Sequence, residues 1–82
     1  MPKPRSLSGD KNLIGNRLIH LRQQHHFSQR SLAYALQLNG YDIDKNVITR
    51  IETNKRYVTD IELKALAEIF HVSYAYLIDG TE

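Results

Sequence analysis

Apolar residues in this chain recur at helical spacing in short segments, and helix-capping or turn residues separate one segment from the next. In the first segment Ile14, Leu18 and Leu21 form one stripe, which predicts a helix over residues 12–25. No segment shows a convincing strand pattern. We therefore predict an all-α fold, a compact domain of five short helices.

Strong start signals place the helices along the chain. The residues suited to N-cap positions are Asp10 or Asn12, Ser28, Asp44, Thr59 and Ser73. Thr59 and Glu62 also have the T-x-x-E spacing of a capping box. The apolar residues that we expect the later helices to bury are Leu32, Ala33, Leu36, Ile48, Ile51, Ile61, Leu63 or Leu66, Ala67, Phe70 and Leu77.

The residue types needed for catalysis or metal binding are missing. Cysteine is absent, which excludes disulfides and thiolate metal sites. The histidines show no H-E-x-x-H spacing, and no set of nucleophile, base and orienting residue is present. We therefore expect no enzymatic activity, no metal and no cofactor. No apolar run is long enough to span a membrane, so we expect no membrane partner.

Charge is unevenly spread along the chain, although its net value is only +2. Residues 1–30 carry a net +5 and residues 45–56 a net +3, whereas residues 31–44 carry −2 and residues 57–82 carry −4. This separation indicates that one surface faces an anionic partner. Residues 1–11 contain prolines, serines and basic residues, and we expect them to form a flexible basic arm.

The helix that Asp44 begins has a polar outer face made of Lys45, Asn46, Thr49 and Arg50. Asparagine can read adenine in the major groove of DNA, and arginine or lysine can read guanine. An ordinary solvated helix face would have a similar composition. The residues by themselves leave these two interpretations open.

Five segments together resemble the Cro/phage-repressor type of helix-turn-helix DNA-binding domain. They are "IGNRLIHLRQ", "FSQRSLAYAL", "VITRIETNKR", "IELKALAEIFHVS" and "YLIDG", in this order, within residues 12–80. The resemblance implies a compact five-helix, lambda-repressor-like domain whose third helix enters the major groove. It also implies a cytoplasmic, DNA-associated transcriptional regulator of bacterial or phage origin, most often a repressor.

The resemblance assigns roles residue by residue. It implies DNA contacts by Gln29, Lys45, Asn46, Thr49, Arg50, Thr53, Lys55 and Arg56, with Tyr57 as a possible addition through its hydroxyl. It implies an ion pair between Arg22 and Glu52 that ties the third helix to the first. Family members usually dimerise through their late helices, which here implies Tyr74, Tyr76 and Ile78 as the interface of a homodimer on a double-stranded operator.

The chain departs from the family pattern at three places. His26 and Asn54 stand where glycine is common at helix ends. The stretch "LNGYDID" makes the connection between the second and third helices several residues longer than usual. Within it Tyr41 either packs on the core or reaches toward the DNA backbone, and we favour packing because a half-buried tyrosine is the commoner case.

A second function remains open beside repression. A similar domain in an antitoxin binds both operator DNA and a toxin partner, so a second protein is an alternative partner for this chain. A co-purifying protein would favour that alternative, whereas an isolated homodimer would favour the regulator.

Overall fold

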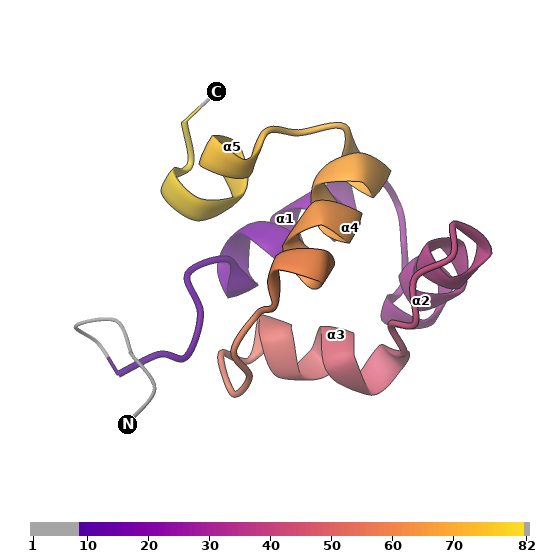
Figure 1. Ribbon diagram of the computed structural model, residues 1–82, viewed down its shortest axis with the longest axis horizontal. Coiled ribbons are helices and arrows are strands. Elements are labelled where there is room, and N and C mark those ends of the chain that lie inside the picture. Colours follow the sequence, from indigo (N-terminus) through magenta and orange to yellow (C-terminus); the bar gives the residue numbers. More distant parts are fainter. Residues whose placement is uncertain (1–8, 82) are drawn as a thin grey trace.

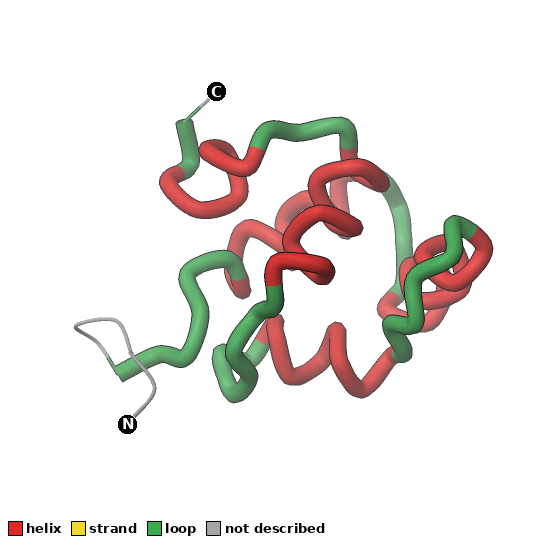
Figure 2. Tube along the Cα trace, viewed as in Figure 1, coloured by secondary structure: helices red, strands yellow, loops and turns green. Residues whose placement is uncertain are grey.

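The computed structural model describes residues 9–81 of the protein, and five helices occupy most of that stretch (Figure 1). They are α1 (Gly15–Gln24), α2 (Gln29–Leu38), α3 (Lys45–Glu52), α4 (Asp60–Phe70) and α5 (Tyr74–Asp79). Figure 2 shows helices and loops but no strand between residues 9 and 81, so the predicted all-α fold is confirmed. None of these helices is long and apolar enough to cross a membrane. The predicted arm lies outside the described residues as far as residue 8.

The core forms where the apolar stripes of all five helices meet. Its fully buried side chains are Leu18, Leu32, Leu36, Ile48, Ile51, Leu66 and Leu77. Each such side chain contributes about 1.5–3 kcal/mol by leaving water. α3 packs against both α1 and α2, while α4 contacts α2 and α5. The helical spacing of apolar residues therefore predicted the core correctly at these positions.

Side chains cap the starts of four helices, as their sequence signals predicted. The hydroxyls of Ser28 and Ser73 accept hydrogen bonds from backbone N–H groups in the first turns of α2 and α5. Asp44 Oδ1 accepts from the N–H of Val47 at 2.9 Å at the start of α3. At α4, Thr59 and Glu62 close the predicted capping box in both directions. These caps satisfy donors that the helices themselves leave unpaired.

α1 begins at Gly15, later than the predicted start at residue 12, because the side chain of Asn12 folds back on the first turn. Asn12 Oδ1 accepts from the N–H groups of Ile14 at 3.1 Å and Gly15 at 2.9 Å. Its Nδ2 donates to the carbonyl oxygens of Ile51 and Arg56. Asn12 therefore satisfies two backbone N–H groups at the start of α1 and also ties this segment to the end of α3 and the loop after it.

Three helices end on residues in the left-handed conformation without being glycine. His26 follows α1 with φ 58°, Asn54 follows α3 with φ 59°, and His71 follows α4 with φ 55°. After α1, the N–H of Phe27 reaches the carbonyl of Arg22 at 2.9 Å, which closes the helix end. The departures at His26 and Asn54 thus keep the backbone shape that glycine usually gives, at a cost in strain.

The prediction that Ile61 is buried is wrong, because its side chain is 65% exposed. In this turn of α4 it is Glu62 that points into the domain, where it completes the capping box and forms an ion pair with Arg56. Ala65 is buried instead. The apolar pattern failed here because the buried position in the first turn of α4 is taken by the paired carboxylate of Glu62 and not by Ile61.

The long connection between α2 and α3 is tied down at both ends. Gly40 adopts φ 90°, and the N–H of Tyr41 then donates to the carbonyl of Leu36 at 3.0 Å, which terminates α2. Ile43 is buried in the core, and its carbonyl accepts from Gln37 Nε2 at 3.1 Å. The connection is therefore an ordered segment packed on the domain.

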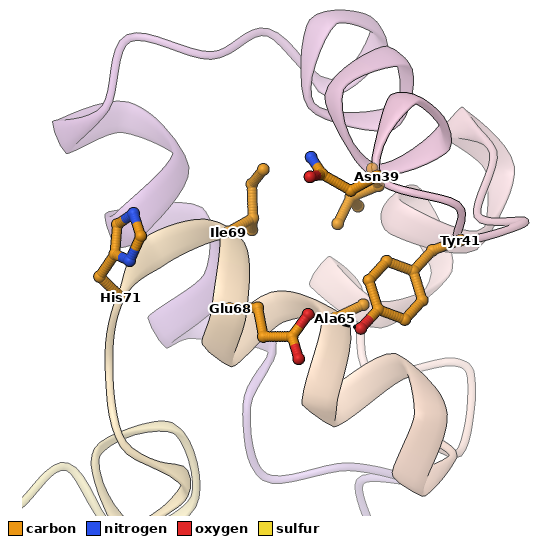
Figure 3. Close-up of a pocket in the computed structure, with 7 residues that line it drawn as sticks. Asn39, Tyr41, Ala65, Glu68, Ile69 and His71 are labelled. Atoms are coloured by element: carbon orange, nitrogen blue, oxygen red, sulfur yellow. Dashed lines mark hydrogen bonds between the residues drawn. The ribbon is translucent and has the colours of Figure 1, made fainter.

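Tyr41 is half-buried against the core and turns toward α4 (Figure 3). Its hydroxyl donates to Glu68 Oε2 at 2.6 Å, and this hydrogen bond to a carboxylate raises the pKa of the phenol above its ordinary value of 10.0. The two residues line a small hollow with Asn39, Ala65, Ile69 and His71. Of the two predicted alternatives for Tyr41, packing on the core is therefore the one observed.

Candidate nucleic-acid interface

α3 lies along the lower edge of the molecule as drawn, and no other helix between residues 9 and 81 lies below it (Figure 1). Ile48 and Ile51 are buried in the core, and α3 packs against both α1 and α2. A Cβ built on Gly15 would come within 2.7 Å of the carbonyl oxygen of Ile51, so glycine lets α1 approach α3 closely. The helix is therefore fixed by its apolar face while its polar face remains outside.

The polar face of α3 carries the residues that the sequence singled out for base reading. Lys45, Asn46 and Arg50 are exposed, and Thr49 is half-buried among them. Residues four apart on a helix are neighbours, so Asn46 lies next to Arg50 and Lys45 next to Thr49. The structure thus brings these four side chains together on one face.

Arg22 and Glu52 form the ion pair that the resemblance implied. Arg22 Nε donates to Glu52 Oε2 at 2.7 Å, and Arg22 Nη2 donates to Glu52 Oε1 at 3.2 Å. The Glu52 side chain is only 5% exposed and that of Arg22 16% exposed. Arg22 Nη1 also donates to the carbonyl of Phe27 at 3.0 Å. The guanidinium therefore joins α1, the following turn and α3.

A third side chain extends this pair toward the polar face. Gln29, the first residue of α2, donates from Nε2 to Glu52 Oε1 at 2.9 Å. Its Oε1 accepts from the hydroxyl of Thr49 at 3.0 Å. Gln29 and Thr49 were both predicted to contact DNA, but the hydrogen bond between them was not predicted, because no spacing rule connects residues on two different helices.

The loop after α3 holds the remaining residues of the predicted interface. The Thr53 hydroxyl donates to the carbonyl of Thr49 at 2.9 Å, so it closes the end of α3. Lys55 is exposed, and its N–H donates to the carbonyl of Arg50 at 2.9 Å. Tyr57 is half-buried, with the Lys11 ammonium 5.7 Å from the centre of its ring.

Arg56 is directed toward α4. Its Nη2 pairs with Glu62 Oε2, and its Nε is buried without a hydrogen-bond partner. Glu62 thus closes the capping box at the start of α4 and also ties the loop after α3 to this helix. The sequence reasoning treated Arg56 as a basic loop residue and missed this pairing.

The residues predicted for a dimer interface differ in exposure. Tyr74 is 50% exposed and Ile78 is 37% exposed. Tyr76 is half-buried, with the guanidinium carbon of Arg17 5.9 Å from the centre of its ring. Arg17 also donates to the carbonyl of Leu77 at 3.0 Å, which ties α5 to α1. Tyr74 and Ile78 are therefore the more available of the three.

Residues 18–77 match a family described as Helix-turn-helix. The chain belongs to the helix-turn-helix family of the Cro and phage-repressor type. Comparison with curated proteins and with solved structures gave no significant match.

Membership in the helix-turn-helix family gives the broad function. The family binds DNA and regulates transcription, and it is not an enzymatic family. In this helix-turn-helix domain the matched stretch contains α2, the long connection, α3 and the loop after it. Together these segments hold all the residues predicted to contact DNA.

Proposed function

We propose that this domain is a sequence-specific transcriptional repressor that inserts α3 into the major groove of its operator. The observation that carries the proposal is the exposed polar face of α3, formed by Lys45, Asn46, Thr49 and Arg50 on a helix whose other face is in the core. An α-helix fits the major groove, where each base pair presents its own pattern of donors and acceptors. Repression follows if the bound domain occludes a promoter.

Within that groove the long polar side chains have separate tasks. Asn46 is suited to a bidentate contact with adenine, whereas Arg50 and Lys45 are suited to guanine. Each such contact discriminates against a wrong base by about 1–3 kcal/mol. Neighbouring Asn46 and Arg50 therefore favour a recognition site in which adenine and guanine lie close together.

Phosphate contacts come from the edges of the same face. Lys55 is exposed just beyond α3, and Thr53 lies beside it. Gln29 uses one hydrogen of its Nε2 for Glu52, so the second hydrogen is left for a phosphate at the start of α2. Arg56 is paired with Glu62, so it is the least available of the basic residues predicted to contact phosphate.

We also propose that the protein binds its operator as a homodimer. Tyr74 and Ile61 are exposed apolar side chains that line a hollow of about 380 Å³ with Asp60, Leu63 and Lys64. An exposed aromatic and an exposed aliphatic residue are suited to the centre of an interface. Two copies would place two α3 helices in major grooves about one helical turn apart.

The same apolar surface also fits the antitoxin alternative, in which a second protein covers it. A stable partner that co-purifies with the chain and shields Ile61 and Tyr74 would support that alternative. A homodimer that binds operator DNA by itself supports the repressor.

Selection of bound sequences from random double-stranded DNA tests the proposal. We expect one enriched sequence with two related halves, and an affinity that falls steeply as salt is raised, because basic residues release counterions from the phosphates. Enrichment of no sequence, at salt concentrations where the protein binds DNA, would contradict sequence-specific recognition.

A further inference from the structure

The hydroxyl group of Thr49 has one hydrogen to donate and lone pairs with which to accept. The structure gives it two partners, Gln29 Oε1 at 3.0 Å and the carbonyl oxygen of Lys45 at 3.0 Å. A carbonyl oxygen only accepts, and so does the oxygen of an amide. Whichever partner takes the hydrogen, it points into the protein and not toward solvent.

The orientation of the Gln29 amide follows from Glu52. Glu52 Oε1 lies 2.9 Å from Gln29 Nε2, and the carboxylate is paired with Arg22. A carboxylate accepts hydrogen bonds, so the amide nitrogen of Gln29 must face it. If the amide were flipped, Gln29 Oε1 and Glu52 Oε1 would face each other, and neither of these two acceptors could donate a hydrogen bond. Glu52 therefore fixes Gln29 Oε1 toward Thr49.

From this arrangement we propose that Thr49 reads the exocyclic amino group of an adenine or a cytosine in the major groove. The inference rests on the proposed function of α3. Only adenine N6 and cytosine N4 donate hydrogen bonds in that groove, whereas guanine N7 and O6 and thymine O4 accept. A hydroxyl whose hydrogen is held inside offers only lone pairs to a base, so guanine and thymine are disfavoured. Glu52 and Gln29 act as positioning residues for this reading.

Base analogues that lack the amino group test the inference directly. In the selected operator, each adenine on the contacted face is replaced by purine and each cytosine by pyrimidin-2-one, and the affinity of the wild-type protein is measured. At one position other than the adenine assigned to Asn46, we expect a loss of about 2- to 10-fold, the value of one neutral hydrogen bond. If no adenine or cytosine responds to removal of its amino group, the inference is wrong.

The protein side of the same test uses two substitutions. Thr49→Val keeps the shape of the side chain but removes the hydroxyl, so its affinity should not change when the analogue replaces the base at that position. Thr49→Ser keeps the hydroxyl and both internal acceptors, and it should keep the dependence on the amino group. Equal dependence in wild type and Thr49→Val would overturn the assignment to Thr49.

Failure of this inference is distinguishable from failure of the proposed function. If Asn46→Ala and Arg50→Ala relax sequence preference while the amino group has no Thr49-dependent effect, only the inference falls. If those two substitutions leave sequence preference intact, α3 is not the reading helix, and both fall.

Discussion

Glu52 holds α3, the proposed reading helix, to the rest of the domain through its carboxylate. Its carboxylate accepts from Arg22 twice and from Gln29 once, and its side chain is 5% exposed. A negative charge on a DNA-binding helix is unfavourable near phosphates, yet here Arg22 neutralises it on the inner side. The pair therefore acts within the protein, where it sets the position of α3.

Removal of one partner of this pair should be costly. We expect Arg22→Met to lower the free energy of unfolding by about 3–5 kcal/mol, because it leaves a buried carboxylate without its charge partner. Replacement of both residues, as Arg22→Met with Glu52→Leu, should cost much less than the sum of the single changes. Urea unfolding of all four proteins gives the coupling free energy, and a value near zero would contradict the brace.

His26 offers a test of backbone strain at a single residue. Its φ of 58° costs a residue with a Cβ about 1 kcal/mol more than glycine. We expect His26→Gly to raise the melting temperature by roughly 4–8 °C, as measured by circular dichroism. His26→Ala is the control, because it removes the imidazole but keeps the Cβ. Equal stabilisation by both substitutions would assign the gain to the imidazole.

At the scale of the helices, the start signals were the most predictive part of the sequence. Ser28, Asp44, Thr59 and Ser73 cap the helices they were expected to cap, since a cap is a local interaction with the next turn. The ends were less predictable, because only the family resemblance marked the position of His26, and no sequence signal marked the left-handed backbone at His71.

The connection between α2 and α3 is held by the hydrogen bond from Tyr41 to Glu68. Because this bond raises the pKa of the phenol, the folded state holds the proton more tightly than the unfolded state. Its contribution to stability is therefore fully present below the ordinary value of 10.0 and is lost as pH rises through the higher folded value. We expect Tyr41→Phe to be less stable than wild type at neutral pH.

Denaturant unfolding at neutral pH and above pH 10 measures this difference. The gap between wild type and Tyr41→Phe should narrow at the higher pH. Tyr34→Phe is the matched control, because Tyr34 is 64% exposed on α2, and it should match wild type at both values. A gap that stays constant with pH would show that the phenolic proton does not contribute.

At the scale of the whole molecule, the apolar pattern predicted the core and the family resemblance predicted the domain. The resemblance implied the pair of Arg22 with Glu52, but two other polar pairs between different segments escaped prediction, Gln29 with Thr49 and Arg56 with Glu62. Such pairs depend on how helices are placed in space, which spacing along the chain does not encode. Ile61 was misplaced for the same reason, because the pairing of Glu62 turned that face outward.

The proposed homodimer also belongs to this scale. We expect Tyr74→Glu to shift the protein from dimer to monomer in sedimentation equilibrium, because it places a charge in the proposed apolar interface. Tyr34→Glu adds the same charge at a similarly exposed tyrosine on α2 and should leave the dimer intact. A wild-type protein that stays monomeric at the concentrations that saturate operator DNA would rule out the dimer.

The most direct measurement of the central claim is the ratio of affinities for operator and for scrambled DNA in three variants. If α3 reads bases, Asn46→Ala and Arg50→Ala should each lower this ratio, by the equivalent of about 1–3 kcal/mol of binding free energy. Lys55→Ala, which removes a proposed phosphate contact, should weaken binding to both DNAs alike and leave the ratio unchanged. If the ratio survives Asn46→Ala and Arg50→Ala, α3 is not the helix that reads the operator.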